Sequence, residues 1–478
     1  MNKDRRRAAR ARFKVLALFV AFTFLFSNAA LAERITSQSA QEASSPSAPQ
    51  SPQQIAAKID EYMQASTRLS RFTGSILVAR NNQLIASKGY GMANFETATP
   101  NTPQTKFRIG SLTKQFTAMG IVMLQERSKL NVNDSVCKYL DACPAAWQPI
   151  TIRNLLTHTS GIQNYTRFPD FAQTRSQIVN PASFVETFKN KPLEFAPGEK
   201  FNYSNSGYYL LGLIIERASG KPYAEFLREN IFIPLGMTNT GYENTRTPAA
   251  NLAVGYSSQG DTLAKASHVD VSVPYAAGAL SSTTEDMLRW DAALYTTKLV
   301  SQKSLDEIFT PFKNNYGYGW GITKKYNRRV VAHDGSINGF TSFIARFPDD
   351  RVTVVVLSNN EDAPSQRIGG ALSAIVFGEN YKIPQERRTV ALDPKSLDAY
   401  AGQYQLAPTF IITVTNENGK LMAQATGQPK FELFAESETE FFLKAVDARV
   451  TFVKDAQGKI TQLILRQNGR DLPAPRIK

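Results

Sequence analysis

Runs typical of β-strands lie at two distant places in this chain, and helical patterns fill the stretch between them. Residues 74–79 and 84–87 form one such pair, joined by Asn81-Asn82, a dipeptide that favours a hairpin turn. Four more β-branched or aromatic runs follow much later, at 318–323, 329–333, 341–347 and 353–358. This arrangement predicts an α/β (α+β) fold, in which both ends of the domain build an antiparallel sheet and the middle forms a helical insertion. The active site would then lie in the crevice between the two parts.

The composition changes near residue 392, where short strand-length runs alternate with turn signals at 416–419 and 455–458. Such spacing is typical of antiparallel meanders. We therefore predict a catalytic domain at 52–383, a linker at 384–391, and a small β-barrel or sandwich at 392–478.

The N-terminus predicts a segment that is removed from the mature protein. A basic region with seven Lys and Arg residues precedes the apolar run 15–26, and Ala30-Leu31-Ala32 supplies a small-residue cleavage pattern. This order is typical of a secretory signal peptide over residues 1–32, with an uncleaved anchor as the alternative. No membrane span is expected after cleavage, because twelve apolar residues fall short of the ~20 needed. Residues 33–51, rich in Ser, Gln, Ala and Pro, predict a flexible leader.

The charge balance gives limited information about partners. Loss of the signal peptide would lower the net charge from +14 to +8, and the remaining basic residues are spread along the chain. Nucleic-acid binding therefore has little support. The excess would favour approach to an anionic envelope polymer, or would serve only solubility.

The two cysteines, Cys137 and Cys143, are six residues apart. In an oxidising compartment they could close a short loop as a structural disulfide, and free thiols are the alternative. The three histidines, His158, His268 and His333, have no metal-ligand spacing. We expect no metal and no cofactor.

A Ser-x-x-Lys pattern occurs twice, at Ser111–Lys114 and at Ser135–Lys138. Ser111 follows a strand-like run and precedes an apolar helical stripe, so the serine and lysine would share one helical face. A buried lysine can lose its proton and activate the hydroxyl. Ser135 lies in a polar turn and reads as a helix cap. Ser111 is therefore the candidate nucleophile.

Two further motifs follow in order, Tyr203-Ser204-Asn205 and His333-Asp334-Gly335. Tyr203 would lie on a loop that enters a helix, where its phenolate could act as a base beside a lysine. His333 and Gly335 would share one face of a strand, and Gly335 would let substrate approach the backbone. Taken singly, each motif has a plainer explanation: a buried tyrosine with a capping asparagine, and a satisfied core histidine.

The three motifs together resemble the serine β-lactamase and penicillin-recognising superfamily, in its class C β-lactamase-like and D-alanyl-D-alanine carboxypeptidase branch. The resemblance covers about residues 52–380, and the C-terminal part resembles a β-rich domain that some members append. Supporting phrases are Phe72-Thr73-Gly74-Ser75, Leu155-Leu156-Thr157-His158-Thr159-Ser160-Gly161 and Pro234-Leu235-Gly236-Met237.

The resemblance implies a covalent acyl-enzyme. Ser111 would attack a carbonyl, Lys114 and Tyr203 would share the proton transfers, and Asn205 would hold a substrate amide. The N–H groups of Ser111 and Ser336 would form the oxyanion hole. One position departs from the β-lactamase pattern, since His333 stands where those enzymes usually carry lysine. Because an unperturbed histidine is largely neutral at pH 7, efficient β-lactam hydrolysis is not expected.

The sequence thus predicts a periplasmic or secreted serine hydrolase that acts on a peptide, amide or ester, with a D-amino-acid peptide of the cell wall as one candidate. The alternatives within enzymes are a carboxylesterase or a weak β-lactamase. Outside enzymes, the alternative is a protein that binds cell-wall fragments. The sequence leaves the oligomeric state open.

Overall fold

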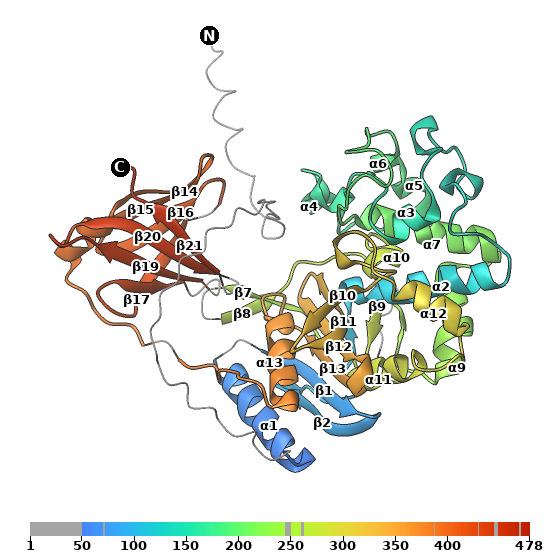
Figure 1. Cartoon of the computed structure of the whole chain (residues 1–478), viewed down its shortest axis with the longest axis horizontal. Helices are drawn as coiled ribbons and strands as arrows, with labels where there is room; N and C mark the ends of the chain where they lie inside the picture. Colours follow the sequence, from blue (N-terminus) through green and yellow to red (C-terminus); the bar gives the residue numbers. More distant parts are fainter. Residues whose placement is uncertain are drawn as a thin grey trace, which may run out of the picture. The chain divides into compact units, whose positions relative to one another are not determined.

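The computed structural model describes residues 50–69, 72–243, 250–259, 262–386, 388–428, 430–443, 448–467 and 470–478. The predicted signal peptide and all but two residues of the predicted leader lie outside them. The chain divides into two compact units, one of Gln50–Gln385 and one that includes Glu386–Lys478 (Figure 1).

The first unit is built on a six-stranded sheet whose strand order is β10-β11-β12-β13-β1-β2. Neighbouring strands are antiparallel throughout, and Gly74 of β1 lies opposite Ser358 of β13. The strands are β1 (Gly74–Arg80), β2 (Gln83–Tyr90), β10 (Gly321–Lys325), β11 (Arg328–Ile337), β12 (Phe340–Phe347) and β13 (Val352–Ser358). The predicted antiparallel sheet from both ends of the domain is confirmed.

Each predicted strand run of the first unit overlaps an observed strand, and three runs differ clearly in their bounds. The run at 84–87 is shorter than β2, which continues to Tyr90. Asn81 and Asn82 form the β1–β2 turn, with φ values of 51° and 61° that suit a tight hairpin. The predicted run at 318–323 begins too early, because the strand is Gly321–Lys325. The run at 329–333 was too short, because β11 continues to Ile337. His333-Asp334-Gly335 therefore lies inside a strand.

Each face of this sheet is covered by helices. Helices α1 (Pro52–Arg68) and α13 (Ser365–Phe377) share one apolar core with the sheet, which includes Ile59, Phe343 and Leu372. Ser51 caps α1 by accepting a hydrogen bond from the Gln54 N–H. The opposite face contributes Leu77, Ile344 and Val355 to a larger core that it shares with the helical part. Figure 1 shows α13 and α1 beside the strands.

The helical insertion is built around α2 and α7, which pack on each other and on α10. Their buried residues include Phe116 in α2 and Leu211 in α7. The helices are α2 (Thr113–Glu126), α3 (Ile152–Leu156), α4 (Phe171–Thr174), α5 (Pro181–Phe184), α6 (Glu186–Lys189), α7 (Asn205–Ser219), α8 (Tyr223–Leu227), α9 (Ile233–Leu235), α10 (Tyr275–Gly278), α11 (Thr284–Ala293) and α12 (Gln302–Ile308). Short strands connect this part to the sheet, and they are β3 (Met92–Asn94), β4 (Thr99–Pro100), β5 (Phe107–Arg108), β6 (Gly241–Tyr242), β7 (Tyr256–Gln259), β8 (Thr262–Lys265) and β9 (Leu280–Ser282).

The second unit is an eight-stranded antiparallel sheet in sequence order that closes almost completely into a barrel. Its ends meet where the Ile477 N–H donates to Gln403 O and Tyr404 bridges to Arg476. The strands are β14 (Gly402–Ala407), β15 (Phe410–Glu417), β16 (Lys420–Ala425), β17 (Lys430–Ala435), β18 (Glu440–Phe442), β19 (Ala448–Lys454), β20 (Ile460–Gln467) and β21 (Arg470–Pro475). The predicted small β-domain is thus a barrel. Part of the predicted linker is fixed to it, because the Val390 N–H donates to Ala435 O.

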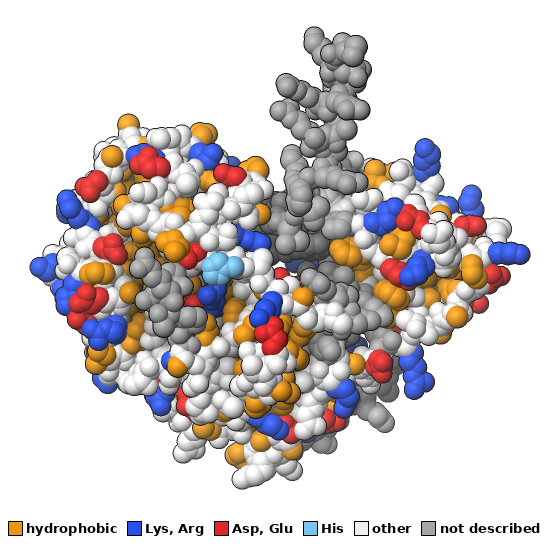
Figure 2. All heavy atoms as spheres, turned by 180° about the vertical axis from the view of Figure 1, so that it is seen from behind, with side chains coloured by type: hydrophobic (Ala, Val, Ile, Leu, Met, Phe, Trp, Pro, Cys, Tyr) orange, Lys and Arg blue, Asp and Glu red, His pale blue; other side chains and the backbone are white. Residues whose placement is uncertain are grey.

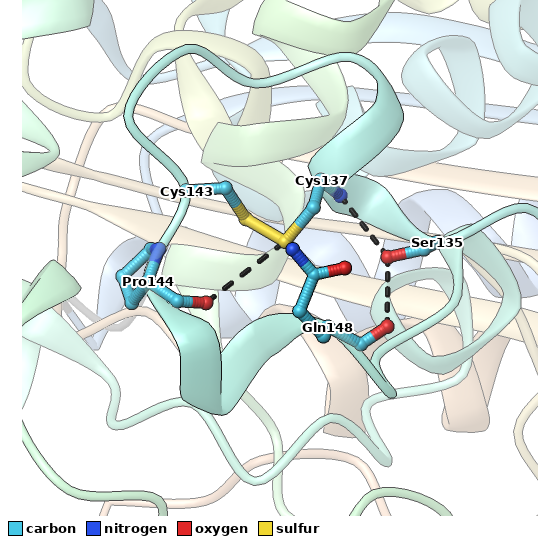
Figure 3. Close-up of a disulfide and its surroundings, with 5 residues drawn as sticks. All are labelled: Ser135, Cys137, Cys143, Pro144 and Gln148. Atoms are coloured by element: carbon cyan, nitrogen blue, oxygen red, sulfur yellow. Dashed lines mark hydrogen bonds between the residues drawn. A yellow bond between two sulfur atoms is a disulfide. The ribbon is translucent and has the colours of Figure 1, made fainter.

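Cys137 and Cys143 form a disulfide that closes a short loop of the first unit (Figure 3). Cys137 follows Ser135, whose hydroxyl accepts a hydrogen bond from the Cys137 N–H and donates to Gln148 O. On the face drawn in Figure 2, basic and acidic side chains are intermixed. None of the helices described is long and apolar enough to cross a bilayer.

Candidate active site

Ser111 lies in the turn that leads into α2. The chain leaves β5, passes Gly110 at a φ of +49°, and forms one 3-10 turn (Gly110–Leu112) before the α-helix begins. The Ile109 N–H donates to Leu280 O, which ties this turn to β9. Ser111 is partly exposed, and the side chains of α2 behind it are buried. The local sequence thus places one hydroxyl at the surface of a packed helix start.

Lys114 is fully buried one helical turn further on. Its Nζ lies 2.8 Å from Asn205 Oδ1, 2.8 Å from Ala277 O and 3.1 Å from Ser111 Oγ. Burial pushes the pKa of Lys114 well below its ordinary value, and the negative charge of Asp334 opposes this only in part. A neutral amine would donate its two N–H groups to the oxygens of Asn205 and Ala277. Its lone pair would then accept the hydrogen bond of the Ser111 hydroxyl.

Tyr203 completes the contacts of Ser111. Its ring centroid lies 4.8 Å from Lys114 Nζ. Burial raises the pKa of Tyr203, and the hydrogen bond with Ser111 lowers it by less. The phenol therefore holds its proton at neutral pH. The sequence suggests a phenolate at this position, whereas here the loss of hydration outweighs the hydrogen bond with Ser111.

Asn205 is the first residue of α7, and Ser204 is its N-cap. The Asn205 N–H donates to Asn164 Oδ1 at 3.1 Å, which fixes the helix start. The side-chain oxygen accepts from Lys114, whereas Nδ2 has a long contact of 3.4 Å with Thr166 Oγ1. The amide of Asn205 thus orients the lysine and keeps a weakly bound donor for a substrate carbonyl.

Gly335 lies directly against the nucleophile's turn. A Cβ atom at Gly335 would be 2.2 Å from Ile109 O, 2.3 Å from Ser342 Oγ and 3.0 Å from the Ser111 nitrogen. No side chain fits there, so glycine is required for β11 to meet the turn. Access of substrate to the Gly335 backbone stays a prediction, and the close approach that the structure shows is to the turn of Ser111.

Ser336 is the next residue along β11, and it is exposed. Its backbone nitrogen would lie 2.9 Å from a Cβ atom placed on Gly110, so the strand and the turn touch at this point also. The backbones of Ser111 and Ser336 therefore border the same small region. That is the arrangement an oxyanion hole of two N–H groups requires.

His333 is buried beside Tyr316. Its Nδ1 lies 2.5 Å from Asp334 O and its Nε2 lies 2.8 Å from the Tyr316 hydroxyl. A carbonyl can only accept, so Nδ1 carries the proton and Nε2 accepts from Tyr316. Burial lowers the pKa of His333 below its ordinary value, which keeps the imidazole neutral at pH 7. A contact with substrate would require one of these two hydrogen bonds to break.

Sequence reasoning missed an aromatic group that lies behind Tyr203. The His158 ring is 4.2 Å from the Tyr203 ring and 4.8 Å from the Tyr316 ring, between centroids. His158 Nδ1 accepts from the Ser204 N–H at 3.1 Å, which holds the Tyr203 loop. The only sequence signal for His158 is the phrase at residues 155–161, which by itself indicates no chemical role. For Tyr316 the sequence contained no signal, since it precedes His333 by 17 residues without a recognisable pattern.

Metal ligation has no candidate here. Within the described part of the chain, no group of three or more His, Cys, Asp or Glu residues is close enough to hold a metal ion.

An antiparallel sheet with helices on both faces, and a serine that contacts a buried lysine and a tyrosine, define a serine hydrolase of the β-lactamase fold. The comparison of sequences identifies the family: residues 55–375 match the family model described as beta-lactamase, and the chain belongs to that family. Residues 386–474, which include nearly all of the barrel, match a model described as a domain of unknown function, DUF3471.

The relatives in sequence include proteins named as penicillin-binding proteins. A penicillin-binding protein of Bacillus subtilis (strain 168) is 32% identical over 85% of this chain and 96% of that protein. The protein flp of Staphylococcus aureus (strain N315) is 31% identical over 75% of this chain and 72% of its own length.

Solved structures agree with this relationship. An octameric penicillin-binding protein homologue from Pyrococcus abyssi superimposes with a TM-score of 0.62 at 25% identity, over 87% of this chain and 99% of that one. A penicillin-binding protein from Bacillus halodurans gives a TM-score of 0.59 at 27% identity, over 66% of this chain and 98% of that one.

Proposed function

We propose that this protein is an exported serine hydrolase that transfers the acyl group of an amide or ester to Ser111 and then to water. The observation that carries this proposal is the position of Lys114 Nζ, fully buried and 3.1 Å from Ser111 Oγ. The N–H groups of Lys114 donate to Asn205 Oδ1 and Ala277 O. The amine is thereby prepared to take the serine proton.

In the first half-reaction, Ser111 Oγ bonds to the substrate carbonyl carbon and its proton passes to Lys114 Nζ. The N–H groups of Ser111 and Ser336 bind the carbonyl oxygen as it becomes negative. The Tyr203 phenol gives its proton to the departing nitrogen or oxygen, and recovers one from the Lys114 ammonium. The raised pKa of Tyr203 keeps the phenol protonated, which is the state that a proton donor needs before this step.

The second half-reaction uses the same groups in reverse. A water attacks the acyl carbon, and its proton passes to the Lys114–Tyr203 pair. The bond to Ser111 Oγ breaks, and Oγ regains its proton. The acid product leaves, and the site returns to its first state.

The substrate class follows less directly. The relatives named as penicillin-binding proteins support a peptide or amide substrate, with a D-amino-acid peptide of the cell wall as the specific candidate. Export through the predicted signal peptide would place the protein in the periplasm or outside the cell. An ester substrate is the second candidate, since the neutral His333 supplies no fixed cation for a substrate carboxylate.

Intact-mass spectrometry after incubation with penicillin tests the proposal, with Ser111→Ala as the control. A stable adduct that is lost in the control is the expected result. Hydrolysed penicillin with an unchanged protein mass would instead indicate β-lactamase turnover. If penicillin is left intact, an activated phenyl ester is the next probe. Failure of both to acylate the wild-type protein would refute the proposed chemistry.

A further inference from the structure

Asp334 is an exposed carboxylate that lies between two residues of the site, His333 and Gly335. Among the described residues its side chain has no hydrogen-bond or ion-pair partner. An exposed carboxylate elsewhere on the surface would face bulk water alone. Asp334 instead lies on β11, the strand that meets the turn of Ser111.

The free edge of β11 brings this carboxylate close to a bound substrate. Strand β10 pairs with β11 only from Arg328 to Ala332, so no described strand pairs with that side of residues 333–337. Ser336, whose N–H would bind the reacting carbonyl oxygen, is two residues beyond Asp334. In extended chain two residues span about 7 Å. A group one residue away from the scissile carbonyl therefore falls within reach of Asp334.

The groups around Asp334 do not cancel its negative charge at the place where a ligand would bind. The carboxylate acts electrostatically on Lys114, Tyr203, His333 and Tyr316, so it lies within electrostatic range of these residues of the site. Lys114 is fully buried and has no surface that a ligand can touch. His333 is buried and neutral, with both ring nitrogens occupied. The charge that a substrate meets along residues 333–337 of this strand is thus negative.

We propose that Asp334 makes this site selective for substrates that carry an ammonium group about one residue from the scissile carbonyl, and disfavours a carboxylate at that place. The inference rests on the proposed acyl-transfer function and adds its substrate class. An amino-acid amide or ester with a free amino group would satisfy it on the acyl side. A cationic alcohol or amine would satisfy it on the leaving-group side.

Boronic acids test the selectivity without knowledge of the natural substrate. The Ser111 oxygen bonds to boron and its proton passes to the lysine, so the boronate imitates the tetrahedral intermediate. Three phenylboronic acids with meta aminomethyl, ethyl and carboxyl groups differ chiefly in charge. Calorimetry on the full-length protein would give the dissociation constant of each for wild type and for Asp334→Asn.

We expect wild type to bind the aminomethyl compound about threefold to fivefold more tightly than the ethyl compound, as for one exposed charge pair. The carboxyl compound should bind more weakly than the ethyl compound by a similar factor. Both differences should shrink in Asp334→Asn, and in wild type at 1 M salt, where screening extends over about 3 Å.

The outcomes separate the two levels of the argument. An order of affinity that is the same in wild type and Asp334→Asn would overturn the selectivity. If each compound binds wild type and Ser111→Ala with the same affinity, Ser111 does not bond to boron. That result would refute the proposed function, and the inference with it.

Turnover then distinguishes the two sources of the ammonium group. Alanine p-nitroanilide against isobutyric p-nitroanilide compares ammonium with methyl on the acyl side. A choline ester against its 3,3-dimethylbutyl counterpart makes the same comparison on the leaving-group side. Asp334→Asn should reduce the preference for the cation in one pair, mainly through KM, and leave the other pair unchanged. No reduction in either pair would contradict the proposal.

Discussion

The two Ser-x-x-Lys segments of this chain have the same spacing and opposite environments. Lys114 is fully buried and lies 3.1 Å from Ser111 Oγ. Lys138 is 62% exposed and forms an ion pair with Asp134. Burial lowers the pKa of Lys114, whereas hydrogen bonding to Asp134 raises the pKa of Lys138. The same four-residue pattern thus produces a candidate base in one place and a surface ammonium in the other.

The serines differ in the same way. Ser135 uses its hydroxyl for the backbone, as it donates to Gln148 O and caps the turn at Cys137. Ser111 has its hydroxyl directed to two side chains, Lys114 and Tyr203. The comparison teaches that the spacing supplies the groups, and that their desolvation and remaining partners decide whether they can react.

The largest expected effect comes from the removal of Lys114, and the matched control is the removal of Lys138. Lys114→Met should slow the acylation of Ser111 about 100-fold to 10,000-fold, the range of a lost general base. Lys138→Met should leave the rate within a factor of two, because Lys138 is exposed and lies outside the site. Stopped-flow acylation with an activated ester measures both. Equal losses in the two variants would end the distinction between the segments.

A methyl group at Gly335 would disturb Ser111 without changing its chemistry. Gly335→Ala places a Cβ atom 2.2 Å from Ile109 O, so the turn or the strand must move. We expect acylation to fall about 100-fold and stability to fall by about 1–3 kcal/mol.

The matched control for this substitution is Gly241→Ala in β6, where nothing lies within 4 Å of the added atom. Its stability should change by less than about 0.5 kcal/mol. Thermal unfolding and the acylation rate would be measured together for both variants. A Gly335→Ala protein with normal acylation would show that the close approach of β11 to Ser111 is unnecessary.

Removal of the disulfide should lower the stability of the protein and leave acylation unchanged, because the disulfide lies at the Ser135 segment and not at Ser111. Cys137 and Cys143 close a loop with a sequence separation of six, for which loop-closure entropy gives about 2 kcal/mol of stability. The double variant Cys137→Ser/Cys143→Ser should unfold at a lower temperature and keep its acylation rate. A slower acylation would mean that the Ser135 segment supports the site after all.

The smallest expected effect is on the pH dependence of acylation. The rate should rise with pH as Lys114 loses its proton, and this limb should lie below 10.5, the ordinary pKa of lysine, because burial lowers the pKa. Asp334 raises that pKa, so Asp334→Asn should move the limb to lower pH. Lys138→Met should not move it. A limb that shifts to higher pH in Asp334→Asn would contradict the assigned sign.

Much of the fold could be predicted because its strands are short, apolar and bounded by turns. The misses have physical causes. The β21 strand contains Pro473, which lacks an N–H and argues against a strand, yet it pairs opposite Ile464 at the end of the barrel meander. The predicted run at 329–333 ends at His333, because Asp334-Gly335-Ser336 are turn-forming residues. Pairing with β12 keeps them extended.

By itself, the sequence determined the nucleophile's context, the sheet made from two distant segments, and the separate β-domain. These follow from local patterns that the chain carries wherever it folds. Only the tertiary structure decided which groups surround Ser111: the Ala277 carbonyl and the Asn205 amide on Lys114, Tyr316 on His333, and Gly335 against the turn. Such contacts join residues that are far apart in sequence, and their effect on proton affinity depends on burial, which no local pattern contains.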